Sequence, residues 1–243
     1  MTQTMSKILP RLAAERGHLD FGWLKTWHTF SFGEYHEDAW MGFRGLRVIN
    51  EDIVAAGAGF PPHPHRDMEI ITIPLAGAIA HQDSTGGKGV IRRGEVQRMS
   101  AGTGVTHSEF NASKPEALHL YQIWLLPRQR GNTPGYEQKA FADADRTGRL
   151  RLVAAPDGRE GAVTIQSDAE LRHGLLTPGQ TLRQPIAAGR HAWVQVVTGA
   201  ITLRAGSESL ALSASDGAGV SAADALEFTA GAQGAELLVF DLA

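Results

Sequence analysis

The sequence predicts an all-β protein made of two β-barrel domains. Helical periodicity is scarce along its 243 residues, and glycine is abundant, with 28 residues. Short apolar runs rich in β-branched residues alternate with glycine-containing turns at near-regular spacing. This pattern is typical of β-sandwiches and β-barrels.

Five apolar runs, taken in chain order, carry this prediction. The N-terminal half contains "LRVINEDIV", "MEIITIPLAG" and "LHLYQIWLLP", and the C-terminal half contains "HAWVQVVTGAITLRAG" and "AELLVFDLA". Valine, isoleucine and aromatic residues fit the half-buried surface of a sheet, so each run is read as one or two strands. The runs cover residues 46–54, 68–77, 118–127, 191–206 and 235–243.

A connector separates the two series of strands. The stretch "DADRTGRLRLVAAPDG" leads from the first series into the second, which places a domain boundary between Pro127 and Arg149. We therefore predict an N-terminal barrel over residues 1–130 and a C-terminal barrel over residues 131–243.

The two halves share an internal repeat. The tripeptide "GAI" at residues 77–79 recurs at 199–201, and the turn "GTGV" at 102–105 recurs as "GAGV" at 217–220. The order of strand, glycine turn, returning strand and second glycine-rich turn favours a duplication. Two stacked barrels are the expected result.

Only the first copy carries histidines at the matching positions. When the halves are aligned on these turns, His63, His65 and His107 meet no histidine in the second half. The shared glycines are therefore read as architectural, and the histidines as a functional site that the first copy adds.

Composition excludes several classes of function. The chain has no cysteine, so it has no disulfide, iron–sulfur cluster or thiol nucleophile, and histidines and carboxylates must hold any metal. A net charge of −3 argues against sequence-independent nucleic-acid binding. No secretion signal or apolar run of membrane length is readable. The expected location is therefore the cytoplasm, without membrane contact.

Two short motifs predict a metal site. Side chains alternate between the faces of a strand, so His63 and His65 point to one side, and His107 and Glu109 do the same on a later strand. Two neighbouring strands would then bring three imidazoles and one carboxylate together inside a barrel. Such a set suits Fe, Mn, Ni, Cu or Zn and leaves coordination positions open for a substrate.

The same residues carry a family resemblance. "FPPHPHRDMEIIT", "HQDSTG", "MSAGTGVTHSE" and "LHLYQIW" resemble the pirin family of the cupin superfamily, with the closest likeness to its bacterial pirin-like quercetin 2,3-dioxygenases. The likeness runs from "GHLDFGWLKTWHTFSFGEY" to the terminal "ELLVFDLA". It implies a bicupin of two jelly-roll (double-stranded β-helix) barrels with one divalent transition metal ion in the N-terminal barrel.

The resemblance also implies a ligand set. By position, the four ligands are His63, His65, His107 and Glu109. Iron is the expected metal, with Ni, Cu, Mn, Co and Zn as alternatives. Glu69, which the general cupin pattern would offer, is expected to be structural or to lie beside the ligands.

The implied activity is quercetin 2,3-dioxygenase. A flavonol would bind through its hydroxyl and carbonyl oxygens, Glu109 would take the hydroxyl proton as general base, and O2 would open the heterocycle with release of CO. Position suggests Met99, Phe110 and Trp124 as apolar walls. Two alternatives stay open: a non-enzymatic, redox-sensing pirin that binds a protein partner, and a dioxygenase of another aromatic enol. The protein is expected to be a monomer.

Other histidines are given structural roles. His81 and His119 fall in strands or at strand ends, where a lone histidine is usually hydrogen-bonded to its neighbours. His28 lies in an N-terminal stretch rich in aromatic residues, which is expected to pack in the core or to close the mouth of the pocket.

Overall fold

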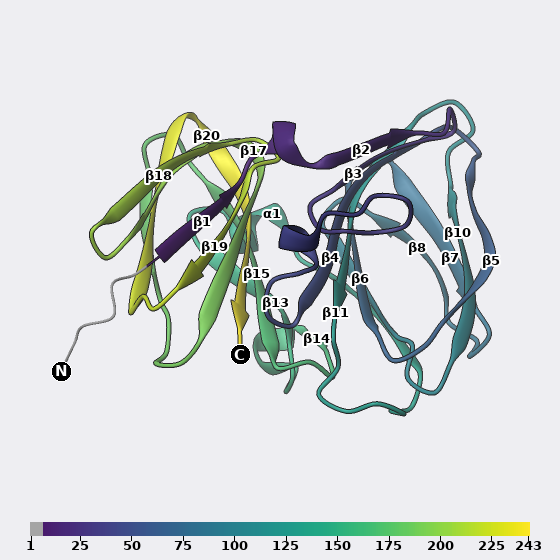
Figure 1. Cartoon of the computed structure of the whole chain (residues 1–243). Coiled ribbons are helices and arrows are strands. Elements are labelled where there is room, and N and C mark those ends of the chain that lie inside the picture. The colour runs from purple at the N-terminus through teal and green to yellow at the C-terminus, as the bar shows by residue number, and fades with distance from the viewer. Residues whose placement is uncertain (1–6) are drawn as a thin grey trace. The chain divides into compact units, whose positions relative to one another are not determined.

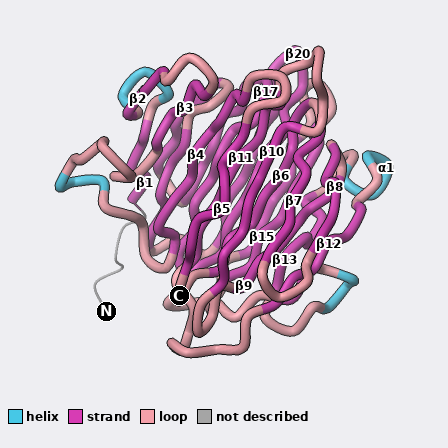
Figure 2. Tube along the Cα trace, turned by 90° about the vertical axis from the view of Figure 1, so that its right-hand side faces the viewer, coloured by secondary structure: helices cyan, strands magenta, loops and turns pink. Residues whose placement is uncertain are grey.

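The computed structural model describes residues 7–243, and these residues are nearly all β, as predicted. Strands dominate the trace, and helices are confined to short turns (Figure 2). The chain divides into two compact units. The site unit comprises residues 17–141 and 155–168, and the second unit comprises the described residues 7–16, 142–154 and 169–243.

The site unit consists of two sheets of hydrogen-bonded strands. The larger sheet has the order β12-β9-β6-β11-β4-β3-β2, and the smaller has the order β5-β10-β7-β8. All of these strands except β9 and β12 are labelled in Figure 1. The elements of this unit are β2 (Gly17–Asp20), β3 (Leu24–His28), η2 (Asp38–Trp40), β4 (Leu46–Val54), β5 (Gly59–His65), β6 (Glu69–Ala76), β7 (Ala78–Asp83), β8 (Lys88–Arg92), β9 (Glu95–Ser100), β10 (Val105–Asn111), β11 (Leu118–Leu125), β12 (Gly135–Ala140), η3 (Arg159–Gly161) and β14 (Val163–Thr164).

The predicted barrel takes the form of two sheets rather than one closed sheet. Apolar side chains of both sheets meet in one cluster, in which Leu24, Val54 and Leu118 of the larger sheet pack with Ile79 and Ile91 of the smaller. A separate cluster gathers Ile70, Met99, Ala101 and Val105. The interior therefore has two apolar regions, and the polar side chains described below lie on the same inner faces.

The second unit is organised around two long strands. β17 and β20 pair along most of their length, and β1, β19, β15 and β13 extend the sheet in the order β1-β19-β17-β20-β15-β13, while β18 pairs with β17 and β16 with β20. The elements are β1 (Lys7–Arg11), η1 (Ala13–Glu15), α1 (Asp143–Arg146), β13 (Leu150–Ala155), β15 (Ala169–Leu176), β16 (Thr181–Pro185), β17 (His191–Ala205), β18 (Glu208–Ser213), β19 (Gly217–Ser221) and β20 (Ala225–Leu242).

The first repeated glycine has the same conformation in both units. Gly77 has φ +76° and Gly199 has φ +73°, in the left-handed region that L-residues with a side chain rarely adopt. An added Cβ would lie 3.0 Å from the carbonyl oxygen of Ala117 at the first position and 2.1 Å from that of Gly234 at the second. Both positions therefore need glycine for conformation and for space.

Some sequence predictions stay predictions. Neither unit is one continuous segment, so the division into residues 1–130 and 131–243 stays a proposal about where the two cupin domains begin and end. Within residues 7–243, no helix is long and apolar enough to cross a membrane. The cytoplasmic location and the monomeric state stay predictions.

Replacing Gly199 by alanine is expected to lower the free energy of unfolding by about 2–4 kcal/mol, because left-handed strain adds to the collision with Gly234. Gly189→Ala is the matched control, since Gly189 has φ +81° but open space around an added Cβ. That control is expected to cost only about 1–2 kcal/mol. Urea denaturation measures both, and equal losses would show that the close approach is unimportant.

Candidate metal centre

The predicted residues lie on one face of the smaller sheet. β10 pairs with β5 on one side and with β7 on the other, and His107 lies directly opposite both His63 and Asp83. Glu109, two residues further along β10, lies opposite His81. Residues directly opposite each other in a ladder share a face, so all five side chains point into the interior between the sheets.

The structure brings the three predicted imidazoles together. His63, His65 and His107 each offer a ring nitrogen, and these three atoms lie within 4.8 Å of one another. Nε2 of His107 is 3.0 Å from Nε2 of His63. The ring centroids of His65 lie 4.8 Å from those of His63 and of His107.

The tautomer of His63 is set by the backbone. Its Nδ1 lies 2.8 Å from the carbonyl oxygen of Pro61, which can only accept, so Nδ1 carries the proton. In the neutral ring Nε2 then has a free lone pair, and this atom faces Nε2 of His107. A backbone carbonyl bound to the far nitrogen is how metal-binding histidines are usually oriented.

Glu109 lies at the edge of this group. Its carboxylate is buried, with 1% of the residue exposed, and it accepts a hydrogen bond from Nε2 of Gln122 at 2.7 Å. Oε1 lies 3.4 Å from the hydroxyl of Thr72. Its oxygen falls within 4.8 Å of ring nitrogens of His107 and His81, so His107 belongs to both groups. Glu109 is thus held beside the imidazoles by the opposite sheet.

His81 lies beside the candidate ligands and is hydrogen-bonded on both ring nitrogens. Its side chain is fully buried, its Nε2 donates to Asp83 at 2.9 Å, and its Nδ1 accepts from Gln97 at 3.0 Å. The Nδ1 atoms of His81 and His107 are 3.5 Å apart. The structural role predicted for His81 is therefore accompanied by contact with two candidate ligands, which sequence reasoning did not anticipate.

The charge state of the histidines fits metal binding. Burial, with smaller effects from neighbouring groups, lowers the pKa of His65 and of His107 to about 4. Burial raises the pKa of Glu109, but the nearby imidazoles of His81, His107 and His63 together bring it below its ordinary value. Neutral imidazoles and an ionised carboxylate are the forms that bind a metal ion. The donor set therefore fits one transition metal ion.

Glu69 lies on the other face of its strand. Its carboxylate accepts hydrogen bonds from the hydroxyl of Ser100 at 2.8 Å and from the backbone of Gln166 at 3.0 Å. Its neighbour Ile70 points into the interior. Glu69 is thus structural and is not one of the clustered side chains, as the sequence suggested. His119 is similarly bonded to Glu51 at 3.0 Å.

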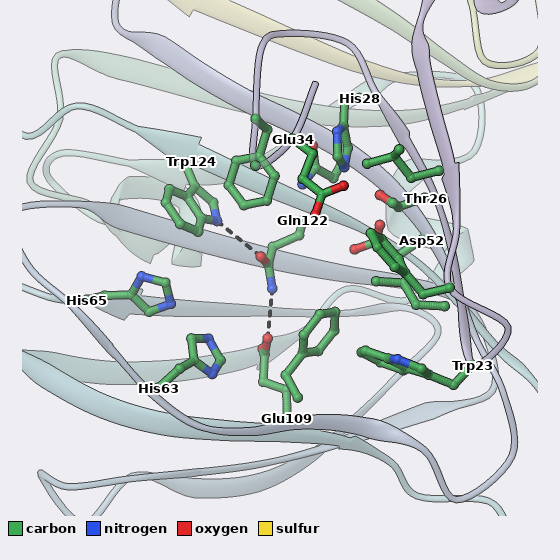
Figure 3. A pocket seen from close by; sticks show the side chains of 17 residues that line it. Trp23, Thr26, His28, Glu34, Asp52, His63, His65, Glu109, Gln122 and Trp124 are labelled. Atoms are coloured by element: carbon green, nitrogen blue, oxygen red, sulfur yellow. Dashed lines mark hydrogen bonds between the residues drawn. The ribbon is translucent and has the colours of Figure 1, made fainter. Parts of the chain in front are cut away.

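A cavity of about 380 Å³ opens beside the histidines, within the size range of small-molecule sites (Figure 3). Trp124 lines it as predicted, and its ring meets that of His65 edge to face at 4.9 Å. Met99 and Phe110 do not line it: Met99 is buried in an apolar cluster, and Phe110 is 39% exposed. The lining residues are Leu19, Phe21, Trp23, Leu24, Thr26, His28, Phe32, Gly33, Glu34, Asn50, Asp52, Phe60, His63, His65, Glu109, Gln122 and Trp124.

The N-terminal aromatic stretch contributes to both the core and the cavity. Trp23, His28 and Phe32 line the cavity, whereas Phe30 is fully buried. Phe32 meets Trp124 edge to face with ring centroids 5.2 Å apart. The stretch therefore packs partly in the core, as expected, and also supplies part of the cavity wall.

A polar region that sequence reasoning missed lies across the cavity from the histidines. Thr26 of β3 is directly opposite Asp52 of β4, and His28 is opposite Asn50. Burial raises the pKa of Asp52 from 3.8 to about 7, while the neighbouring Thr26 hydroxyl opposes the shift. Polar residues at alternate positions within the apolar run "LRVINEDIV" were the signal that could have revealed this region.

Comparisons with known proteins agree with this architecture. A family model described as Pirin matches residues 11–125, and one described as Quercetinase C-terminal cupin domain matches residues 152–242. The chain is 48% identical over 236 residues to a quercetin 2,3-dioxygenase of Escherichia coli (strain K12), covering 97% of this chain and 98% of that protein. It is 38% identical over 228 residues to a pirin-like protein of Caulobacter vibrioides, covering 93% and 96%.

A solved structure extends the likeness to three dimensions. The bacterial pirin YhhW from Escherichia coli, in complex with nickel(II), superposes with a TM-score of 0.90 at 45% identity. The match covers 97% of this chain and 99% of that one. The two cupin domains and the jelly-roll architecture implied by the resemblance are therefore confirmed.

The raised pKa of Asp52 predicts a pH-dependent stability. Between about pH 4 and 7 the folded protein keeps a proton on Asp52 that the unfolded chain releases, so this group's contribution to stability is lost as the pH rises through about 7. Asp52→Asn lacks this loss. It is expected to be more stable than wild type at about pH 8, by at most about 4 kcal/mol, and similar to it near pH 4.

Urea denaturation of both proteins near pH 4, 6 and 8 measures this difference. Asp38→Asn is the control, because the side chain of Asp38 is 98% exposed and its removal should give a curve parallel to wild type. A constant difference between Asp52→Asn and wild type across this range would contradict the burial of an acid with a raised pKa.

Proposed function

This chain belongs to the pirin family, and on that premise we propose that it is a metal-dependent dioxygenase that opens the heterocyclic ring of flavonols such as quercetin, using O2 and releasing CO. The observation that carries the proposal is the cluster of His63, His65 and His107, of which His63 and His65 line one side of a largely apolar cavity (Figure 3). Relatives named quercetin 2,3-dioxygenase support the choice of reaction.

We propose that His63, His65, His107 and Glu109 hold one divalent transition metal ion. Three neutral imidazoles and a carboxylate suit several metals. Iron is our first expectation, and the nickel(II) complex of the similar YhhW supports nickel as an alternative; Cu, Mn, Co and Zn remain compatible with the donor set. When bound, the metal supplies Lewis acidity that lowers the pKa of a coordinated hydroxyl group.

Glu109 is the proposed general base. Its carboxylate is ionised, buried and next to His107, so it can accept the proton that the flavonol hydroxyl loses. Gln122 donates to Oε2, which fixes the carboxylate and leaves Oε1 beside the weak contact from Thr72. The resulting flavonolate is electron-rich and reacts with O2. Both oxygen atoms of O2 remain in the ring-opened ester, and the carbon that carried the hydroxyl leaves as CO.

The walls of the cavity orient the planar rings. Trp23 and Phe60 meet edge to face at 5.1 Å on one side, and Phe32 and Trp124 form a similar pair on another. These four side chains line the cavity. Apolar flat surfaces of this kind bind an aromatic substrate and lower the local dielectric, which strengthens the interactions of Glu109.

The test is an oxygen-dependent assay on protein whose metal content has been measured. The proposal expects quercetin absorbance to fall only when O2 is present, with one CO released for each quercetin consumed. Fully metal-loaded protein that leaves quercetin unchanged in O2 would contradict the proposed function.

His107→Ala is expected to remove most of the bound metal, because one of only four proposed protein ligands is lost. His119→Ala is the matched control, since His119 is bonded to Glu51 on the other face of its strand. Elemental analysis of the two variants, purified side by side, measures metal per chain. Full occupancy in His107→Ala would show that the ligand set is wrong.

Glu109→Gln is expected to retain more metal than activity. The amide keeps the shape and an oxygen donor but cannot take a proton, so turnover should fall by roughly 100-fold or more. Steady-state quercetin consumption, divided by the metal content of the same sample, gives the comparison. Equal turnover per metal ion in Glu109→Gln and wild type would exclude Glu109 as the base.

A further inference from the structure

The cavity has a second polar end, built on the larger sheet. Thr26, Asn50 and Asp52 line it from the neighbouring strands β3 and β4. Each of these residues is at most 3% exposed. Because Thr26 and Asp52 are directly opposite in the ladder, and Asn50 is two residues from Asp52, the three side chains share the inner face.

These side chains have unused hydrogen-bonding capacity. Oδ1 of Asp52 and Oδ1 of Asn50 are buried and have no hydrogen-bond partner among the described residues, and the buried Thr26 hydroxyl has no partner there other than the neighbouring carboxyl group of Asp52. Leaving a buried polar atom unpaired is energetically unfavourable. Two such oxygens beside a hydroxyl group on one wall of a cavity are therefore expected to meet polar groups of a ligand.

The second polar end of the cavity lies apart from the histidines, with Gln122 between them. Gln122, which binds Glu109, is directly opposite Asn50, so Asp52 is its diagonal neighbour at roughly 7–8 Å. In Figure 3, His63 and His65 lie on one side of Gln122, and Asp52 and Thr26 lie on the other. Apolar groups such as Trp23 and Phe60 complete the wall. A planar ligand that reaches from one end to the other would have oxygen atoms at both.

The free atoms also define the chemistry of that ligand. Carboxyl and amide oxygens accept hydrogen bonds, and the Thr26 hydroxyl can accept or donate. Hydroxyl groups of the ligand would supply the matching donors. An unsubstituted aromatic ring at this position would instead leave the buried oxygens of Asp52 and Asn50 unpaired, which disfavours its binding.

We propose that Asp52, together with Thr26 and Asn50, binds hydroxyl groups at the end of the substrate remote from its metal-chelating oxygens, and so selects polyhydroxylated aromatic enols over unsubstituted ones. This inference rests on the proposed function for the position of the chelating end. It assigns Asp52 as a specificity-determining residue.

The test compares two probes under anaerobic conditions, where binding is separated from turnover. Quercetin carries hydroxyl groups remote from its chelating oxygens, and 3-hydroxyflavone carries none. Dissociation constants are measured by fluorescence titration of protein with known metal content. Wild type is expected to bind quercetin roughly 10- to 100-fold more tightly than 3-hydroxyflavone, and Asp52→Leu is expected to lose most of that ratio.

Two further variants keep the test decisive. Thr26→Val removes a single hydroxyl and is expected to reduce the preference for quercetin over 3-hydroxyflavone severalfold. This variant still tests the proposal if Asp52→Leu does not fold. Glu51→Gln is the matched control, because Glu51 neighbours Asp52 on β4 but accepts a hydrogen bond from Tyr121 on the other face. Its quercetin preference is expected to equal that of wild type.

The outcomes separate this inference from the proposed function. A wild-type protein without preference, or an unchanged preference in both Asp52→Leu and Thr26→Val, overturns the role of Asp52 even if quercetin is oxidised. A preference that depends on Asp52, in protein that shows no O2-dependent loss of quercetin, supports this binding site and contradicts the dioxygenase proposal.

Discussion

The site depends on the convergence of imidazole nitrogens in a buried interior. Nε2 of His63 and Nε2 of His107 approach to 3.0 Å, and Pro61 holds the proton of His63 on the opposite nitrogen. Two lone pairs this close repel each other unless a proton or a cation lies between them. Burial lowers the pKa of His107 to about 4, which disfavours the doubly protonated ring at neutral pH. A metal ion bound by both nitrogens would satisfy this arrangement, and such an ion is what we propose for the site.

The two sheets of the site unit contribute different residues to the site. The smaller sheet supplies the imidazoles and Glu109, and the inner face of the larger sheet supplies a row of polar residues directly opposite one another. His28, Asn50, Gln122, Thr72 and Gln97 form this row across five strands. Gln122 and Thr72 contact Glu109, and Gln97 contacts His81. Apolar clusters lie on either side of the row, so the polar groups are confined to the metal centre and the cavity.

The sequence predicted the parts of the site that depend on local geometry. Strand alternation alone was enough to place His63 with His65 and His107 with Glu109, and the missing histidines in the second copy marked them as functional. The sequence could not reveal how distant strands pair and pack. That arrangement decides that Gln122 donates a hydrogen bond to Glu109 and that Thr26 lies directly opposite Asp52. The same limit explains why Met99 was wrongly assigned to the cavity wall, because its position in β9 does not reveal which space it faces. Phe110 was wrongly assigned for a different reason: the alternation that points His107 and Glu109 inward puts Phe110 on the exposed face of β10.

Anomalous diffraction from crystals of the metal-loaded protein tests the proposed ligand set most directly. One metal peak is expected, bounded by ring nitrogens of His63, His65 and His107 and by a carboxylate oxygen of Glu109, each at about 2.0–2.2 Å. His81 would lie outside this set, hydrogen-bonded to Asp83. A peak ligated by His81, or a fully loaded protein whose metal lies elsewhere, would contradict it.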